Sequence, residues 1–473
     1  MESMGFLVNG EWKTRGERLT VRSPFNGEPV GETYRASSED VEQAIQASVR
    51  AFEQTRKMAT YERTDILEGV ARGIQREREN LARSIAQEAG KPLKTARVEV
   101  DRAVLTFTDA AEEIKRLEGE WLPLDRIAAS RGRWGLVRRF PLGPISAISP
   151  FNFPLNLVAH KLAPAIGAGN SVVLKPASQT PLTALRLARL FEEAGVPAGA
   201  LNVLPSSPAV AEPLCTDDRL KLLTFTGSPA VGWELKQRAR KKRVVLELGG
   251  NAGVIVHKDA DIEYAATRCA LGGFSYAGQS CISVQRILVE KSCYDRFLEA
   301  FLPKVESLKI GDPLDEKTDV GPMINEREAQ RVEEWVAEAK KAGARMLLGG
   351  ERQGAVYPPT VLSEVKRDMK VNCQEVFAPL VTVSRYEDFE EALKQVNDSD
   401  FGLQAGVFTR DVGLMFRAYE ALEVGGVIAG DAPTFRIDPM PYGGVKDSGL
   451  GREGARYALE EMTERKLLVV CAM

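Results

Sequence analysis

The segment KLLTFTGSPAVG, residues Lys221 to Gly232, joins an apolar strand to the start of a helix. Ser228 is a residue type that caps helices, and Pro229 suits the first helical position. The lack of a side chain at Gly227 leaves room for a phosphate group at the helix N-terminus, where backbone N–H groups are unpaired. The segment therefore predicts a strand–helix unit with a candidate phosphate site, although many helices without a ligand begin in the same way.

The same rhythm extends on both sides of this segment. The pattern predicts strands at residues 144–149, 171–174, 200–204, 221–226 and 243–248, and helices at 155–168, 181–194, 208–215 and 228–241. Strands that alternate with helices in this way form a parallel sheet covered on both faces. The expected unit is a Rossmann-like doubly wound domain, which binds dinucleotides at the carboxyl ends of its strands.

The rest of the chain is less regular. Before residue 120 we expect short strands and then helices, with Ser37 capping the first helix and amphipathic stretches at 61–89 and 96–116. Residues 131–140 alternate basic and apolar side chains, which favours an exposed ribbon. A second α/β alternation runs from 253 to 428, with helices expected at 260–274 and 326–342 and strands at 284–289 and 380–384. The tail, 466–471, is a strand without a sequence neighbour, and we expect it to complete a sheet elsewhere, such as in another subunit.

Composition narrows the class of protein. The chain has 473 residues, 63 basic and 66 acidic side chains, and a formal net charge of -3. This balance disfavours a nucleic-acid partner, and the apolar runs are too short for a membrane span. The N-terminus shows no secretory signal, so we expect a cytoplasmic protein. The six cysteines avoid CxxC spacing and only two histidines, His160 and His257, are present, so we expect no metal site.

One literal G-x-G-x-x-G motif is present, at Gly449, Gly451 and Gly454. A dinucleotide fingerprint requires a preceding strand and a surrounding βαβ unit. Here Gly443-Gly444 precedes the motif and only 19 residues follow it. We therefore interpret this segment as a turn-rich connection.

Seven segments together resemble the aldehyde dehydrogenase superfamily, in the family's order and over nearly the whole chain. They are PFNFPL (150–155), VLKP (173–176), FTGS (225–228), LELGG (246–250), GQSC (278–281), EVFAP (375–379) and PYGGVK (441–446). The resemblance implies a cofactor-binding domain (1–118 and 144–248), an α/β catalytic domain (249–454) and a small β oligomerisation element (119–143 and 455–473). It also implies a homodimer or homotetramer.

The resemblance assigns four catalytic residues. Cys281 matches the nucleophile, since a thiolate attacks a carbonyl and leaves a labile thioester. Asn152 matches the side-chain donor to the oxyanion, although by itself it fits a turn beside Pro154. Glu247 matches the base for hydrolysis, and its apolar neighbours predict a raised pKa. Lys161 matches a lysine that assists proton movement.

The resemblance likewise assigns the cofactor residues. They are Phe151, Lys175, Ser178, Gly227, Ser228, Gly232, Glu375 and Phe377. Lys175 by itself is as well explained by a solvated charge at the end of a strand. Many NAD-preferring relatives have a glutamate at the position of Ser178. Because a hydroxyl tolerates a 2′-phosphate that a carboxylate repels, we expect NAD or NADP to bind and NADP to be preferred.

The substrate is less well defined. His160 and Ser280 stand where relatives that act on anionic aldehydes often carry arginine, which argues against a strongly anionic substrate, although Arg102, Arg286 or Arg436 can compensate. The segments around His160 and Arg436 are similar to the lactaldehyde dehydrogenase branch, so both are candidate substrate residues; His160 equally fits a packing role. We expect oxidation of a small hydroxylated aldehyde such as lactaldehyde to its acid. The alternatives are a semialdehyde dehydrogenase such as a succinate-semialdehyde enzyme, a CoA-acylating enzyme, and a catalytically silent relative. Retention of Glu247 favours hydrolysis over CoA acylation.

Overall fold

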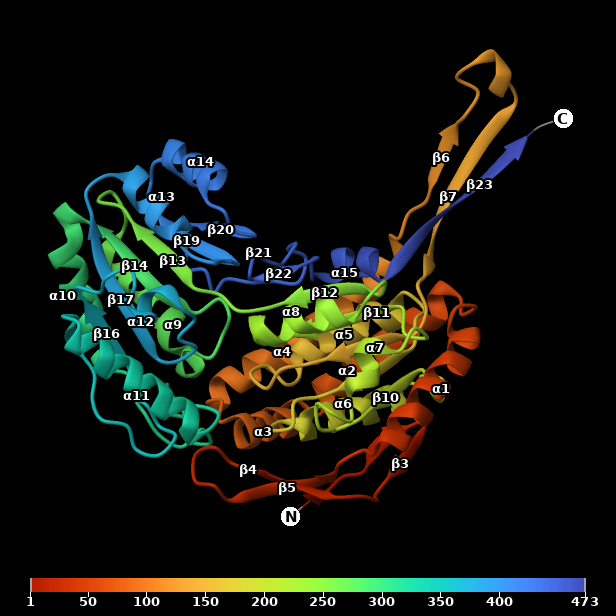
Figure 1. Cartoon of the computed structure of the whole chain (residues 1–473), viewed down its shortest axis with the longest axis horizontal. Helices are drawn as coiled ribbons and strands as arrows, with labels where there is room; N and C mark the ends of the chain where they lie inside the picture. The colour runs from red at the N-terminus through yellow and green to blue at the C-terminus, as the bar shows by residue number, and fades with distance from the viewer. Residues whose placement is uncertain (1, 472–473) are drawn as a thin grey trace.

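Two large sheets and a projecting three-stranded arm organise the chain (Figure 1). The computed structural model describes residues 2 to 471. Figure 1 shows the arm, formed by β6, β7 and β23, extending away from both sheets, with the C-terminal end near its tip. Within residues 2–471, no helix combines the length and the apolar character needed to cross a membrane.

The first sheet confirms the predicted doubly wound unit. Its central strands are parallel and lie in the order β12, β11, β8, β9, β10. Their bounds are β8 Ile145–Ile148, β9 Val172–Lys175, β10 Leu201–Val203, β11 Leu222–Thr226 and β12 Arg243–Glu247. The chain runs outward from β8 to β10 and then returns to β11, so the strand order reverses between β8 and β11. Dinucleotides bind beyond the carboxyl ends of the strands at such a reversal.

Other segments extend this sheet or lie close to it. The strands β2 (Phe6–Val8) and β3 (Glu11–Lys13) add antiparallel pairs at one edge, and β22 (Gly449–Leu450) pairs antiparallel with β12 at the other. A separate small sheet contains β1 (Glu2–Ser3), β4 (Arg18–Arg22) and β5 (Pro29–Tyr34). The G-x-G-x-x-G segment thus forms a two-residue edge strand and turns, as the sequence predicts.

The helices of this half follow the predicted order with shifted ends. They are α1 Ser38–Thr55, α2 Thr60–Arg76, α3 Arg78–Ala89, α4 Leu93–Lys115, α5 Asn156–Gly167, α6 Pro181–Glu193, α7 Glu212–Thr216 and α8 Pro229–Arg238. The stretch 61–89 is not one helix, because the backbone leaves helical geometry at Glu77 and both α2 and α3 then pack against α4. The helix expected at 208–215 is also too long, since residues 208–211 form a turn.

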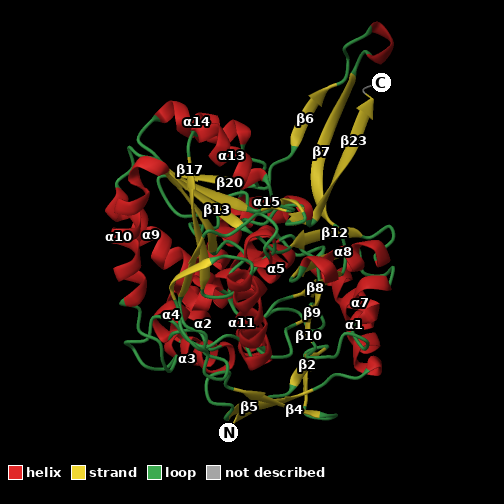
Figure 2. Ribbon diagram, turned by 60° about the vertical axis from the view of Figure 1, so that its left-hand side comes forward, coloured by secondary structure: helices red, strands yellow, loops and turns green. Residues whose placement is uncertain are grey.

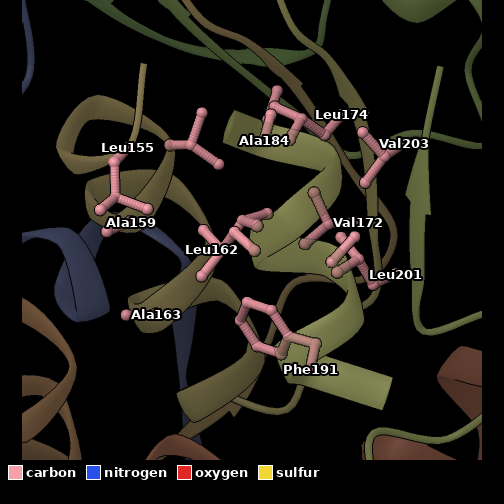
Figure 3. Close-up of a cluster of buried hydrophobic side chains, with 14 of the residues drawn as sticks. Leu155, Ala159, Leu162, Ala163, Val172, Leu174, Ala184, Phe191, Leu201 and Val203 are labelled. Atoms are coloured by element: carbon pink, nitrogen blue, oxygen red, sulfur yellow. The ribbon is translucent and has the colours of Figure 1, made fainter. Parts of the chain in front are cut away.

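The core of this half lies between the sheet and its helices. Figure 3 shows Leu162 and Phe191, from α5 and α6, directed toward Val172 of β9 and Leu201 of β10. These side chains are at most 1% exposed. Burying each one contributes about 2 kcal/mol to the free energy of unfolding. The strands read as continuous apolar runs because helices cover both faces of the sheet.

The second sheet confirms the second α/β alternation. Its strand order is β15, β16, β17, β14, β13, β19, β20. The bounds are β13 Ala252–Val256, β14 Val284–Glu290, β15 Arg345–Leu348, β16 Thr360–Ser363, β17 Leu380–Tyr386, β19 Gln404–Phe408 and β20 Gly426–Ala429. The accompanying helices are α9 Ile262–Phe274, α10 Tyr294–Glu306, α11 Glu326–Lys341, α12 Lys370–Cys373, α13 Phe389–Asn397 and α14 Val412–Ala421. A two-stranded sheet pairs β18 (Phe401–Gly402) with β21 (Val445–Lys446).

The arm corrects one expectation about the tail. The strand β23 (Thr463–Cys471) finds its partner within the same chain, where it pairs antiparallel with β7 (Arg133–Pro141), which also pairs with β6 (Glu120–Pro123). Sequence distance hid this partner. Figure 2 shows the three strands projecting together as one ribbon. The preceding helix α15 (Ala455–Glu461) packs against α4 and α5 instead of joining the arm.

Candidate active site

Cys281 lies in the region between the two sheets, shortly after a turn whose backbone has left-handed conformation. Tyr276, Ala277 and Gly278, in the short helical segment η2 (Ser275–Gly278), have φ angles of 51°, 51° and 66°. A Cβ atom at Gly278 would lie 2.0 Å from the carbonyl oxygen of Ala378, so only glycine fits there. Non-glycine residues in this conformation cost about 1–3 kcal/mol each, and such strain concentrates at functional sites. The surrounding structure therefore holds this turn in a strained conformation, as is typical of functional sites.

Cys281 is half-buried and contacts a tyrosine. Its Sγ lies 3.1 Å from the Oη of Tyr442. Burial raises the pKa of the Cys281 thiol to about 12, and the hydrogen bond with Tyr442 opposes that rise. The sulfur at rest is a thiol, so its reaction with an electrophile requires removal of a proton.

Asn152 meets the same turn from the side of the first sheet. Its Nδ2 donates a hydrogen bond to the carbonyl oxygen of Gln279 at 3.0 Å, two residues before Cys281. The Gln279 side chain is itself held, because its Oε1 accepts from the N–H of Ile324 at 2.8 Å. The Asn152 amide has a second N–H, which remains available to an acceptor. The structure thus brings Asn152 and Cys281 together, as the sequence predicts.

Glu247 ends β12 and is 3% exposed. Neither of its carboxylate oxygens accepts a hydrogen bond from any residue between 2 and 471. Burial, and then the neighbouring charge of Glu453, raise the pKa of Glu247 well above its ordinary value. This agrees with the predicted direction of the pKa and gives the site a carboxyl group that binds a proton more tightly than an exposed glutamate.

Behind Glu247 lies a group of buried charged side chains from α4, α5 and the segment 436–453. Lys161 Nζ donates to the hydroxyls of Thr226 at 2.7 Å and Thr224 at 3.1 Å, and lies 3.5 Å from Glu453 Oε1. Although burial opposes it, the charge of Lys161, and with it that of Arg436, holds the pKa of Glu453 well below its ordinary value. Glu453 therefore remains ionised, and its negative charge adds to the effect of burial in raising the pKa of Glu247.

Arg436 continues this network toward Cys281. Its Nη2 donates to Glu453 Oε2 at 2.9 Å and to His160 Nδ1 at 3.0 Å, and its Cζ lies 3.4 Å from the centre of the Tyr442 ring. Since arginine only donates, His160 Nδ1 accepts, and Nε2–H donates to Asp438 Oδ1 at 2.8 Å. Both ring nitrogens of His160 are thus used within the protein, which favours a role in holding Arg436.

Two guanidinium groups at the site retain unused N–H groups. Arg102 Nη2 and Arg436 Nε are buried without a hydrogen-bond acceptor in the described part of the chain. Arg102 lies on α4, with Nη2 3.8 Å from Asp438 Oδ1. Burial, and then the charge of Arg436, lower the pKa of the Arg102 guanidinium. Arg286 donates to the carbonyl oxygens of Asn251, Gln395 and Val396 and lies outside this group, although its Nε also lacks an acceptor among the described residues.

The predicted cofactor residues follow the carboxyl ends of the first sheet. Lys175 ends β9, is 9% exposed and forms no ion pair with any described residue. Ser178 is half-buried in the bend between β9 and α6. Ser228 precedes α8 as the sequence predicts, but its hydroxyl caps no N–H group within the described chain and is exposed.

The glycines of this region have packing reasons of their own. A Cβ atom at Gly227 would lie 2.5 Å from the ring of Phe225, and one at Gly232 would lie 2.3 Å from Leu248. The missing side chain at Gly227 is therefore required by Phe225 and not only by an incoming phosphate. Gly232 allows α8 to pack closely on the segment after β12.

The remaining cofactor candidates lie near one another and near Cys281. The rings of Phe151 and Phe377 meet edge to face with centroids 6.1 Å apart. Glu375 Oε1 accepts a hydrogen bond from the N–H of Gly250 at 2.8 Å, and burial raises the pKa of Glu375 to about 7. These contacts link the segment 375–377 to the loop after Glu247.

Sequence reasoning missed parts of the site. Glu453 lies inside the glycine-rich segment that we interpret as a connection, and Asp438 stands in no motif. Tyr442 belongs to a matched segment, yet its contact with Cys281 carries no sequence signal. A backbone bridge between Tyr442 and Glu453 places both side chains at the site.

Similarity to known proteins identifies the family of this chain. The sequence model of the Aldehyde dehydrogenase family matches residues 12–468. The chain belongs to the aldehyde dehydrogenase family. It is therefore an oxidoreductase that acts on aldehydes, which confirms the fold and the activity that the sequence resemblance implies.

Three relatives give detail. A 3-sulfolactaldehyde dehydrogenase from Priestia aryabhattai is 46% identical over 471 residues, covering 99% of this chain and 98% of its own. The crystal structure of aldehyde dehydrogenase 21 from Physcomitrella patens, in complex with the reaction product succinate, has a TM-score of 0.98 and 44% identity over 99% of this chain and 98% of its own. The glyceraldehyde-3-phosphate dehydrogenase GapN from Methanocaldococcus jannaschii, complexed with NADP, has a TM-score of 0.93 and 40% identity, covering 97% of this chain and 100% of its own.

The protonation state of the Cys281 thiol is directly testable. In the cofactor-free protein, alkylation of Cys281 by iodoacetamide should be slow at about pH 7 and should keep rising up to about pH 10, because burial raises the pKa of its thiol to about 12. Mass spectrometry of the Cys281 peptide measures the rate, with the exposed Cys471 as an internal reference. A rate that levels off below about pH 9 would contradict the buried thiol.

Proposed function

We propose that this aldehyde dehydrogenase oxidises a short 2-hydroxyaldehyde with an anionic far end to the carboxylic acid, with Cys281 as nucleophile. The observation that carries this proposal is the pair of buried guanidinium groups, Arg102 and Arg436, next to Tyr442. Tyr442 in turn contacts the sulfur of Cys281 at 3.1 Å. An aldehyde bound at the sulfur has its far end along the Tyr442 ring, toward these arginines.

The chemistry follows from the residues around the sulfur. The Cys281 thiol first loses its proton to water, and the thiolate then adds to the carbonyl carbon, so that negative charge moves to the aldehyde oxygen. The free N–H of Asn152 donates to that oxygen; one such donor is worth about 3 kcal/mol in the transition state. A bound nicotinamide cofactor supplies a hydride acceptor, and the loss of hydride leaves a thioester on Cys281.

Hydrolysis completes the reaction. Glu247 removes a proton from water, the water oxygen attacks the thioester carbon, and the sulfur leaves as the carboxylic acid forms. Burial and the charge of Glu453 raise the pKa of Glu247 toward the range in which a carboxylate is an effective base. Lys161 lies between Glu453 and the Thr224 and Thr226 hydroxyls, where it maintains the charge balance of this buried group.

Buried, unused N–H groups favour an anionic partner. Each N–H left without an acceptor costs about 1–3 kcal/mol, which a carboxylate, sulfonate or phosphate oxygen recovers on binding. The names of three relatives include sulfolactaldehyde, succinate and glyceraldehyde 3-phosphate, and all three compounds are anionic. These observations outweigh the sequence argument from His160 and Ser280 against anionic substrates.

The substrate proposal predicts a charge-selective effect. The Arg102→Met variant should raise the KM for 3-sulfolactaldehyde roughly 30-fold, since a hydrogen bond to a charged group is worth about 2 kcal/mol. The KM for uncharged lactaldehyde should stay unchanged. Arg97→Met is the matched control, because Arg97 lies on the same helix and pairs with Glu79 and Glu316.

The same steady-state assays decide among the alternatives. Acid must form without added CoA, and product that requires CoA would favour the acylating class. Succinate semialdehyde is the second candidate substrate, because succinate is the product bound in the Physcomitrella patens relative. An Arg102→Met variant that loses activity equally on charged and uncharged aldehydes would contradict the anionic site.

We further propose that NADP is preferred over NAD. Lys175 and Ser178 lie at the carboxyl edge of the first sheet, and Ser178 brings no carboxylate to repel a 2′-phosphate. Arg35 adds positive charge at the same edge. Its place there follows from Ala36, the next residue, whose N–H donates to the carbonyl oxygen of Pro205. Pro205 follows β10, the strand beside β9. Burial lowers the pKa of Lys175, and so does the charge of Arg35. The edge-to-face rings of Phe151 and Phe377 and the free Ser228 hydroxyl fit a nicotinamide and a pyrophosphate.

Cofactor titrations test this preference. The wild-type protein should bind NADP more tightly than NAD, and Ser178→Glu should weaken NADP at least about tenfold while NAD binding persists, because the new carboxylate repels the 2′-phosphate. Thermal-shift titration gives both affinities, and Ser178→Ala is the control for loss of the hydroxyl alone. Tighter binding of NAD by the wild-type protein would refute the preference.

We propose the three functional domains that the sequence resemblance implies: cofactor binding by 1–118 and 144–248, catalysis by 249–454, and oligomerisation by 119–143 and 455–473. The sheets support this division, although β22 joins the first sheet and α15 packs on α4 and α5. Leu467, Leu468 and Val469 of β23 are 50%, 57% and 44% exposed, on both faces of an edge strand. Such an edge favours pairing with a second copy, as a homodimer or homotetramer. A cytoplasmic location stays a prediction from the sequence.

The oligomer has its own test. Light scattering should give a mass that is a multiple of 51.9 kDa. Leu468→Lys should shift the protein toward the monomer, since a charge would be buried at the proposed contact. The control is Tyr61→Lys, at a 68% exposed position on α2. A wild-type monomer would exclude this role for the arm.

A further inference from the structure

We propose that Lys91 is a positioning residue for the oxyanion-binding side of the active site. Its buried ammonium, held between the rings of Phe153 and Tyr276, sets the spacing between the segment that carries Asn152 and the turn that carries Cys281. This inference rests on the proposed function, because it acts through Asn152. Lys91 itself touches neither sulfur nor substrate.

Lys91 is a charged side chain that the protein encloses completely. It follows α3 in the link to α4 and is 1% exposed. Gly90 has a φ of 68°, and a Cβ atom there would lie 2.8 Å from both Pro24 and Pro322, so the backbone that leads to Lys91 is fixed. A lysine enclosed in this way has little freedom to adopt another position.

Two aromatic rings from different parts of the chain contact the ammonium group. Its Nζ lies 3.5 Å from the centre of the Phe153 ring and 4.4 Å from that of Tyr276. The two rings meet edge to face with centroids 6.2 Å apart. A desolvated cation is attracted to the negative face of an aromatic ring more strongly than a hydrated one. Phe153 directly follows Asn152, and Tyr276 stands three residues before Gln279.

The counter-ion of Lys91 also forms hydrogen bonds with the start of α5. Lys91 Nζ donates to Glu99 Oε2, and Glu99 is also fully buried. The other oxygen, Oε1, accepts from the N–H groups of Leu155 at 2.9 Å and Asn156 at 3.2 Å. These N–H groups lie at the start of α5, which also carries His160 and Lys161. The ion pair thus fixes the residues on the other side of Asn152.

Tyr276 is held from its far end as well. Its Oη donates to the carbonyl oxygen of Ala89 at 2.9 Å, two residues before Lys91. The hydrogen bond from Asn152 to Gln279 therefore lies between two segments that both pack on Lys91. A shift of Phe153 relative to Tyr276 changes the distance from Asn152 to the carbonyl oxygen of a substrate on Cys281.

Stability alone does not explain a buried lysine here. Replacing a buried ion pair by apolar side chains of similar volume is often neutral or stabilising. Burial lowers the pKa of Lys91 to about 8, so the folded protein holds this charge at an energetic disadvantage. The lysine ammonium makes directional contacts with two ring faces and one carboxylate, which a methionine side chain does not make.

A double-mutant cycle between Lys91 and Asn152 tests the proposal. The assay is the burst of nitrophenolate from p-nitrophenyl acetate without cofactor, since acylation of Cys281 by this ester needs the oxyanion donor but no hydride acceptor. Lys91→Met should slow the burst about tenfold or more, because misplacing a donor by about 1 Å costs up to 10²-fold. Asn152→Ala should slow it about 100-fold. The double variant should match Asn152→Ala alone, since Lys91 acts through Asn152.

Controls separate positioning from general damage. Lys94→Met is the matched control, because Lys94 lies on α4, is 41% exposed and pairs with Asp319; it should leave the burst unchanged. Phe153→Leu should reproduce the coupling with Asn152 and covers the case in which Lys91→Met fails to fold. If the rate reductions of the two single variants multiply in the double variant, or if the burst is unchanged in Lys91→Met, the role of Lys91 is overturned. An unchanged burst in Asn152→Ala would instead refute the proposed function.

Discussion

The hydrogen bond from Asn152 Nδ2 to the carbonyl oxygen of Gln279 joins the two halves of the molecule at the active site. Asn152 follows β8 of the first sheet, and Gln279 leads into β14 of the second. Cys281 and the proposed cofactor edge belong to different sheets, so the proposed hydride transfer requires this junction to hold them at a fixed distance. Three features hold this junction in one geometry. They are the left-handed turn at 276–278, the contact of Gly278 with Ala378, and the contacts of Lys91 with Phe153 and Tyr276.

Around that junction the protein separates two carboxyl groups by their surroundings. Glu453 faces Lys161, Arg436 and His160 and stays ionised, whereas Glu247 accepts no hydrogen bond from the described residues and holds its proton more tightly. Two titratable groups whose environments move their pKa values apart are typical of acid–base sites. The same cluster leaves N–H groups of Arg102 and Arg436 unused, so the charges that raise the pKa of Glu247 lie next to the proposed anion site.

The sequence predicts the doubly wound sheet well, because buried parallel strands such as 222–226 are continuous apolar runs next to helix-starting signals. It also proposes Cys281, Asn152 and Glu247 as catalytic residues through the family resemblance, and the structure places all three in the same region. It does not predict the break at Glu77, the pairing of β23 with β7, or the cluster around Glu453. These features arise from contacts between segments far apart in sequence, such as His160 with Asp438, and distant contacts leave no local pattern.

The proposed mechanism requires that Cys281 carries the acyl group and that Glu247 releases it with water. The decisive measurement is mass spectrometry of the Glu247→Gln variant after mixing with 3-sulfolactaldehyde and NADP. We expect a burst of NADPH that stops, with the acyl mass on the Cys281 peptide, because the glutamine cannot take a proton from water. Undiminished turnover, or an acyl group on another residue, would contradict it.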